Sequence, residues 1–142
     1  MKVRAINPMH MTPNYQERFW AKTERTVGGC IEWTGARSPS GYGKFSVGFA
    51  EQARRYNAHR FAWAVTRGDT PLELDHLCRN RACVNPDHLE PVTRVENVRR
   101  AMRETCPAGH LFTPENTQLE RGRPGQAWTR RCRICRRNRR AA

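Results

Sequence analysis

The sequence predicts a mixed α+β fold in which bound metal ions supplement a small hydrophobic core. Alternating apolar residues predict a short strand at 72–76, and residues 89–92 are expected to return as a second strand. Thr93 and Glu96 fit the capping-box pattern and predict that a helix follows. Six cysteines lie among histidines in a chain of 142 residues that is only 37% hydrophobic, so metal sites are expected to stabilise the fold.

Three metal-binding side chains follow the first predicted strand. Cys78, Cys83 and His88 lie in one short polar segment, and thiolate with imidazole is a ligand set that suits tetrahedral zinc. Cys30 is the only other cysteine upstream of this loop. A closed site of three thiolates and one imidazole would be structural, whereas a site with an open position could be catalytic.

A second set of polar residues consists of Asp75, His76 and Asn97. A histidine at a strand end beside a carboxylate can act as a general base near neutral pH. Carboxylate and amide oxygens are hard ligands appropriate to Mg²⁺, and asparagine is a mediocre helix former, so Asn97 is expected to have a task. The alternative is that His76 is a fourth zinc ligand and Asn97 only a polar helix residue.

The motif Asp-His-Leu-Cys-x4-Cys-Val-Asn-Pro-x-His-Leu-x7-Asn, which runs from Asp75 to Asn97, resembles the His-Me finger (HNH-type) nucleases. The similarity is greatest to the zinc-binding homing endonucleases that include the His-Cys box enzymes, and it extends from Cys30 to Arg100. It implies a His-Me finger ββα-metal core. By this resemblance the general base is His76, the catalytic metal ligands are Asn97 and Asp75, and the structural zinc ligands are Cys30, Cys78, Cys83 and His88.

The resemblance implies an endonuclease that hydrolyses DNA phosphodiester bonds. His76 would take a proton from a water molecule, which would attack phosphorus in line. One Mg²⁺ or Mn²⁺, held by Asn97 and Asp75, would stabilise charge on the leaving oxygen. Arg60, in a His-Arg pair that many relatives share, would hold the scissile phosphate, because a guanidinium group suits phosphate oxygens.

The segments before this motif are expected to complete a nuclease domain at residues 14–104. Residues 1–13 are expected to be a flexible arm, and a helix is expected to begin at Asn14 and continue to about Arg25. Residues 30–35 and 41–47 are expected to pair as a β-hairpin. A strand at 54–56 and a helix at 58–66 follow in this interpretation.

Residues 105–142 are expected to form a C-terminal, zinc-ribbon-like module. A Cys-x3-His pair and a distant Cys-x2-Cys pair supply four ligands for a second structural zinc: Cys106, His110, Cys132 and Cys135. Residues 121–125 are expected to be a turn-rich loop between two strands. From residue 121 to the last residue there are nine arginines and no acidic residue, which predicts a clamp on the DNA backbone.

The net charge of +13 predicts a polyanionic partner. We expect double-stranded DNA, no membrane association and an intracellular location, such as the cytoplasm of a bacterial host for a phage-encoded protein. Monomer and homodimer both stay open. The alternatives are a non-catalytic zinc module that binds nucleic acid and a zinc hydrolase with an open metal position. The candidate DNA-binding residues are Arg37, Tyr42, Lys44, Arg130, Arg131, Arg133, Arg136 and Arg137.

Overall fold

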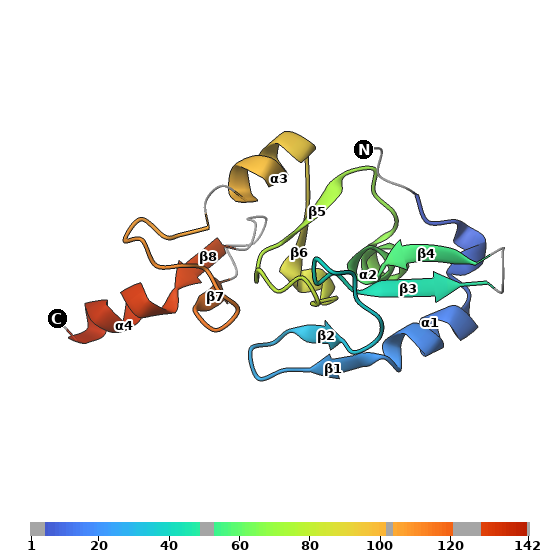
Figure 1. Ribbon diagram of the computed structural model, residues 1–142, viewed down its shortest axis with the longest axis horizontal. Coiled ribbons are helices and arrows are strands. Elements are labelled where there is room, and N and C mark those ends of the chain that lie inside the picture. Colours follow the sequence, from blue (N-terminus) through green and yellow to red (C-terminus); the bar gives the residue numbers. More distant parts are fainter. Residues whose placement is uncertain (1–4, 49–52, 102–103, 121–128, 142) are drawn as a thin grey trace.

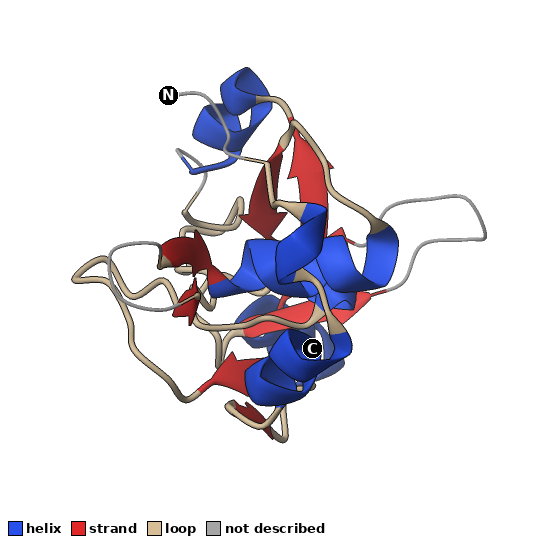
Figure 2. Cartoon of the chain, turned by 90° about the vertical axis from the view of Figure 1, so that its right-hand side faces the viewer, coloured by secondary structure: helices blue, strands red, loops and turns tan. Residues whose placement is uncertain are grey.

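The computed structural model describes residues 5–48, 53–101, 104–120 and 129–141. Within this part of the chain, short strands pair two by two into four antiparallel ribbons and do not join into one sheet. Figure 2 shows the strands as short pieces spread among the helices. Figure 1 places β3, β4, α1 and α2 at one end of the molecule and the C-terminal β7, β8 and α4 at the other. The ribbon of β5 and β6, with α3, lies between them.

The N-terminal segment packs against the core, although the sequence predicts a flexible arm at 1–13. Ile6 is 3% exposed and belongs to the main hydrophobic cluster. Its backbone N–H donates to Oδ2 of Asp69 at 3.0 Å. The 3-10 helix Pro8–His10 and helix α1, Pro13–Trp20, follow it. Burial of Ile6 therefore ties residues 6–13 to the domain; residues 1–4 lie outside the described part.

The first ribbon differs from the predicted hairpin. Strand β1, Thr23–Arg25, pairs with β2, Ile31–Trp33, so the first helix ends at Trp20 and does not continue to Arg25. The turn between the strands contains Gly29 with φ of +78°, a conformation that glycine adopts without strain. Residues 31–33 therefore do not pair with 41–47 as predicted, and the expected hairpin is reduced to its turn end, where Arg37 and Gly43 form an isolated antiparallel bridge.

The second ribbon joins β3, Lys44–Val47, to β4, Arg54–Asn57. Helix α2, Ala58–Arg67, follows directly and ends at Gly68, whose φ is +82°. The strand at 54–56 and the helix at 58–66 are confirmed. Residues 49–52, between the two strands, lie outside the described part of the chain.

Four aromatic rings from different elements form the centre of the main core. Phe19 of α1 stacks on Trp33 of β2, with ring centroids 4.9 Å apart, and contacts Phe45 and Phe61 at 5.2 and 4.9 Å. All four side chains are 3% exposed or less. Aromatic pairs add roughly 0.5–1.5 kcal/mol each beyond the area that they bury, so this cluster fixes α1, α2 and the first two ribbons relative to one another.

The strand-loop-strand-helix order predicted for 72–100 is confirmed. Strand β5, Glu73–His76, pairs antiparallel with β6, Leu89–Val92, and helix α3 runs from Arg94 to Ala101. The 3-10 helix Pro86–His88 precedes β6. At the start of α3, the backbone N–H of Glu96 donates to the Thr93 hydroxyl at 3.2 Å, which is one half of the predicted capping box.

The C-terminal residues form a small separate ribbon and helix. Strand β7, Thr117–Glu120, pairs with β8, Thr129–Cys132, and helix α4 runs from Arg133 to Ala141. The loop predicted at 121–125 lies outside the described residues. Among the helices that the structure describes, none is long and apolar enough to cross a membrane.

Candidate active site

A cleft of about 420 Å³ lies between the β5–α3 unit and the C-terminal module. His76, at the end of β5, and Asn97, on α3, both line it, together with Asp75. The structure therefore brings together the three residues that the sequence predicts for the catalytic centre. Their convergence follows from the local fold, because α3 packs on β5 directly after the β5–β6 ribbon (Figure 1).

The His76 ring is held in one orientation by a backbone contact. Its Nε2 lies 3.1 Å from the carbonyl oxygen of Cys83, and a carbonyl can only accept, so Nε2 carries the proton in the neutral ring. Burial lowers the pKa of His76 to about 4, despite partial compensation by this hydrogen bond and by the Asp75 charge. The imidazole is therefore neutral at pH 7, with the lone pair on Nδ1.

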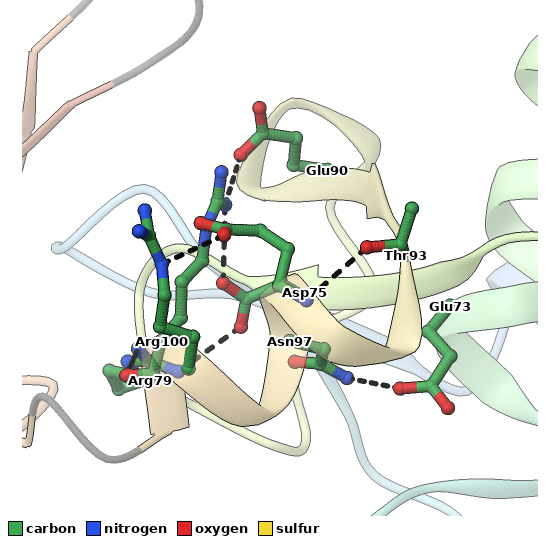
Figure 3. A network of polar contacts seen from close by, with 9 residues as sticks. Glu73, Asp75, Arg79, Glu90, Thr93, Asn97 and Arg100 are labelled. Carbon is green, nitrogen blue, oxygen red and sulfur yellow. Dashed lines mark hydrogen bonds and ion pairs between the residues drawn. The ribbon is translucent and has the colours of Figure 1, made fainter.

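Asn97 is oriented by an acidic residue that the sequence analysis did not identify. Its Nδ2 donates to Oε2 of Glu73 at 2.6 Å, as Figure 3 shows. Because the amino group is fixed in this way, the amide oxygen is left to accept or to bind a cation. Glu73 lies on β5, as do Asp75 and His76. Helix α3 packs on this strand, and Asn97 therefore lies next to Glu73.

The Asp75 carboxylate lies in an ion-pair network (Figure 3). Its Oδ1 accepts from Arg79 at 3.1 Å and its Oδ2 lies 3.4 Å from Arg100. Arg100 also contacts Glu90 and Glu96. Asp75 is only 4% exposed, so its charge is compensated chiefly by the two guanidinium groups. The carboxylate reaches the cleft, but a metal ion there would share it with Arg79 and Arg100.

Two further rings surround His76. His59 and His76 have centroids 4.6 Å apart in an edge-on arrangement, and Tyr42 lies 5.7 Å from His76. Nδ1 of His59 is buried with no hydrogen-bond partner among the described residues, and burial lowers the pKa of His59 well below its usual value. The neutral rings enclose one side of the candidate base; the sequence predicts Tyr42 as a DNA contact but not as a neighbour of His76.

Arg60 lies outside the cleft and binds the loop before β5. Its guanidinium donates to the carbonyl oxygens of Leu72 and Thr70 at 2.8 and 2.5 Å and pairs with Asp69 at 3.1 Å. It is not among the residues that line the cleft. The arginine predicted to hold the scissile phosphate thus fastens α2 to the loop before β5, because three acceptors of that loop surround it, and we do not include it in the proposed site.

The predicted first zinc ligands converge in one buried cluster, the first cluster: Cys30, Cys78, Cys83 and His88. Nδ1 of His88 lies 3.5 Å from Sγ of Cys30 and 3.6 Å from Sγ of Cys83. Tetrahedral zinc with ordinary Zn–S and Zn–N bonds separates such atoms by about 3.6 Å. The donor set and its spacing therefore fit zinc.

The three sulfur atoms of the first cluster lie close enough together to influence one another's ionisation. Hydrogen bonds from Cys78 and Cys83 lower the pKa of the Cys30 thiol, whereas hydrogen bonding to Cys30 raises the pKa of Cys78. Three crowded thiols cannot all ionise without a positive ion between them. His76 is not a member of this cluster, so the ligands close the site without the candidate base.

A second cluster gathers the predicted C-terminal ligands: Cys106, His110, Cys132 and Cys135. Nδ1 of His110 lies 3.5, 3.7 and 3.3 Å from the three sulfur atoms of Cys106, Cys132 and Cys135. These separations again match a tetrahedral zinc site. Both clusters could therefore hold a metal ion, and each supplies the four ligands that a structural zinc requires.

The basic residues predicted to contact DNA have different surroundings. On the C-terminal module, Arg131 and Arg136 pair with Glu120 at 3.2 and 3.4 Å. Arg133 lies 3.4 Å from the Thr117 carbonyl oxygen, and Arg137 is exposed on α4. These interactions with Glu120 and Thr117 leave much of each guanidinium accessible for phosphate contacts.

Three other basic candidates for DNA contact have partners within the protein. Arg37 donates to the Trp33 carbonyl oxygen at 2.7 Å, and Nζ of Lys44 donates to Asn57 at 2.6 Å. Arg130, on β8, is half-buried with its guanidinium 4.8 Å from the centroid of Phe112. Arg37 and Lys44 thus have structural partners, and Arg130 points into the molecule.

The structure thus places β5, β6 and α3 beside a Cys/His cluster that could bind a metal ion. A family profile described as "HNH endonuclease" matches residues 56–99, which contain His76 and Asn97. The chain belongs to the HNH endonuclease family.

Proteins of two phages are similar to this chain. The "Uncharacterized gene 5.3 protein" of Enterobacteria phage T3 is 30% identical over 81 residues, covering 54% of this chain and 80% of the T3 protein. "Protein 2.8" of Escherichia phage T7 is 34% identical over 82 residues, covering 58% of this chain and 55% of that protein. "Protein 7.7" of the same phage is 34% identical over 70 residues, covering 48% and 51%. Solved structures give no significant match.

Proposed function

We propose that the chain is a metal-dependent endonuclease that hydrolyses phosphodiester bonds of double-stranded DNA, with His76 as the general base. The observation that carries the proposal is the His76 ring, which the Cys83 carbonyl holds in one orientation in the same cleft that Asn97 lines. Membership of the HNH endonuclease family supports it. The net charge of +13 supports a nucleic-acid partner.

In the proposed reaction, one residue accepts the proton and its neighbours keep it in position. Nδ1 of His76 accepts the proton of the attacking water, because Nε2 is engaged by the Cys83 carbonyl oxygen. His59 and Tyr42 pack against the imidazole and limit its rotation. The position of the scissile phosphate would be next to His76 and Asn97, where the cleft is open to solvent.

Two oxygen donors suit a catalytic Mg²⁺ or Mn²⁺ in this cleft. The Asn97 amide oxygen is left available by the Glu73 contact, and the Asp75 carboxylate lines the same cleft. A divalent ion bound there would stabilise the charge that develops on the leaving oxygen. The cleavage products would carry 5′-phosphate and 3′-hydroxyl ends.

Both Cys/His clusters are proposed to hold structural zinc, which makes the scaffold independent of the catalytic metal. The first cluster belongs to the nuclease domain that we assign to residues 14–104, and the second to the C-terminal module at 105–142. The four ligands of the first cluster exclude His76. Removal of zinc and removal of Mg²⁺ should therefore have different effects on the protein.

Plasmid cleavage by the wild type and by His76→Ala across a series of divalent metals tests the function. Loss of a general base lowers the rate by about 10²–10⁴-fold, while DNA binding and zinc content should be kept. His10→Ala is the matched control, since the His10 ring lies 2.8 Å from the Tyr56 hydroxyl and packs near Tyr15, and His10 does not line the cleft. Equal rates for His76→Ala and wild type, or loss of zinc in His76→Ala, would contradict the assignment.

The same assay separates the alternative function. A non-catalytic, zinc-stabilised module that binds nucleic acid is favoured by one specific observation, the exposed arginines of α4. Such a module would bind the plasmid with the same salt dependence but leave it intact in Mg²⁺ and in Mn²⁺.

A further inference from the structure

The second wall of the catalytic cleft is built by the C-terminal module. Leu111, Phe112 and Thr113 line the same cleft as His76 and Asn97. The ring of Phe112 is half-buried, whereas Leu111 is 57% exposed. An aromatic ring beside a phosphodiester site offers a flat apolar surface, and nucleosides are the part of the substrate that such a surface contacts.

Two contacts hold Phe112, one to its ring and one to its backbone. The Arg130 guanidinium lies 4.8 Å from its centroid, and the Phe112 backbone N–H donates to the Glu104 carbonyl oxygen at 2.8 Å. Nη1 of Arg130 is buried without a hydrogen-bond partner among the described residues, so the stacking on Phe112 is a main interaction of this group.

The second cluster joins the two segments that make this support. His110 precedes Phe112 by two residues, and Cys132 follows Arg130 by two residues. Nδ1 of His110 and Sγ of Cys132 lie 3.7 Å apart. A metal ion in the second cluster would therefore fix the ring and its guanidinium partner relative to each other.

The module is also anchored to the nuclease domain. Leu119 of β7 packs against Cys30, Cys78 and Cys83 of the first cluster. A groove next to this contact is lined by residues of both parts, among them Thr26, Asn80, Glu115 and Arg133. The position of Phe112 opposite His76 is thus set by side-chain packing and not only by the chain connection at 102–103.

We propose that Phe112 is a substrate-positioning residue that contacts the nucleoside next to the scissile phosphate, so that the C-terminal module completes the active cleft. This inference rests on the proposed nuclease function. It assigns the module a role that its arginines alone would not give. Arginines that only tether the DNA would raise the affinity for all DNA sequences alike. A residue in the wall of the cleft also changes the cleavage rate of the DNA that is already bound.

Phe112→Leu and Phe112→Tyr form the test pair. Leucine keeps apolar volume against Arg130 but removes the ring, and tyrosine keeps the ring. Stacking of an aromatic ring on a base of single-stranded nucleic acid is worth roughly 5- to 150-fold, and we take the same range for the contact with one nucleoside. We expect Phe112→Leu to lower the single-turnover cleavage rate of supercoiled plasmid at saturating protein by a factor in this range. Phe112→Tyr should stay near the wild-type rate, and both variants should keep two zinc ions per chain.

A second readout does not depend on cleavage. The affinity for a short fluorescein-labelled DNA duplex, measured without divalent metal, should be weaker for Phe112→Leu than for Phe112→Tyr. The slope of affinity against salt should be unchanged in both, because no charge is removed. If Phe112→Leu cleaves and binds like the wild type, the inference is overturned while the His76-dependent activity stands.

The remaining outcomes are also decisive. If both substitutions lower the rate equally and both lose zinc, Phe112 is a structural residue of the module and the inference is wrong. If the wild type itself does not cleave, the proposed nuclease function fails. In that case equal affinity of the Leu and Tyr variants also overturns the contact with the nucleoside.

Discussion

His76 and Asn97 each have one polar atom engaged by a fixed partner, so the opposite atom of each side chain is left for the reaction. The Cys83 carbonyl holds Nε2 of His76, and Glu73 holds the amino group of Asn97. Partners of this kind set the orientation of a catalytic group before the substrate binds, and their loss typically costs 10–100-fold in metal affinity or activity.

Glu73→Gln tests this arrangement at Asn97. A glutamine can present either an amide oxygen or an amino group to Asn97, so the Asn97 amide is no longer held in one orientation. We expect the Mg²⁺ concentration for half-maximal plasmid cleavage to rise about tenfold, with zinc content unchanged. Glu24→Gln, at an exposed position of β1, is the control. An unaltered Mg²⁺ dependence of Glu73→Gln would show that the contact does not position Asn97 for metal binding.

At the scale of secondary-structure elements, the two clusters differ in which parts of the chain they connect. The first cluster takes Cys30 from the segment before β2, Cys78 from the turn after β5 and His88 from the 3-10 helix before β6. It therefore joins two ribbons that share little backbone pairing. The second cluster joins only segments of the C-terminal module. The consequences of losing each metal should differ accordingly.

Cys83→Ser and Cys135→Ser compare the two clusters with one chemical change. Structural zinc contributes about 10–16 kcal/mol to small zinc-binding domains, which is comparable to the whole stability of a domain, about 5–15 kcal/mol. We expect Cys83→Ser to be unfolded at room temperature by circular dichroism. Cys135→Ser should bind one zinc ion fewer and retain a cooperative thermal transition from the main core.

The opposite result, a cooperative transition in Cys83→Ser and none in Cys135→Ser, would mean that the C-terminal module stabilises the core. Zinc content, measured on both variants after gel filtration, separates loss of one ion from loss of both. Among the described residues, the main hydrophobic cluster has no member from the C-terminal module, and this is why we expect the core to survive the loss of the second metal.

The element order could be predicted wherever the signal was local. The capping pair at Thr93 marked α3, and cysteine spacing marked both clusters, because ligand chemistry depends on residue type and separation along the chain. Strand pairing is not local in this sense. Residues 31–33 could pair with 23–25 or with 41–47, and the choice depended on the close turn at Gly29 and on the packing of Trp33.

At the scale of the whole molecule, contacts between distant segments could not be predicted from the sequence. Glu73 beside Asn97 and Leu119 on the first cluster join residues with no shared motif. Arg60 fitted a family pattern in sequence, yet the loop 69–72 supplies enough acceptors to bind its guanidinium. The motif predicted some of the side chains that line the cleft, but it did not predict that Leu111, Phe112 and Thr113 of the C-terminal module also line it.

The net charge of the molecule leads to a prediction about how its affinity for DNA depends on salt concentration. With a formal charge of +13, DNA binding should release counterions, and the logarithm of affinity should fall linearly with the logarithm of salt concentration, by about 0.9 for each phosphate contacted. The exposed arginines of the C-terminal helix are expected to supply several of these contacts. Arg137 is exposed on α4 and is therefore the position at which a single contact can be removed.

Arg137→Ala should reduce the magnitude of the salt slope by about 0.9 and weaken binding to all DNA sequences alike. Arg67→Ala is the matched control, because the Arg67 guanidinium already pairs with the Asp87 carboxylate at 2.5 Å at the end of α2. Its slope should stay near that of the wild type. Fluorescence anisotropy of a labelled duplex over a salt series measures both. A larger change for Arg67→Ala than for Arg137→Ala would move the DNA-binding face from α4 to the surface around α2.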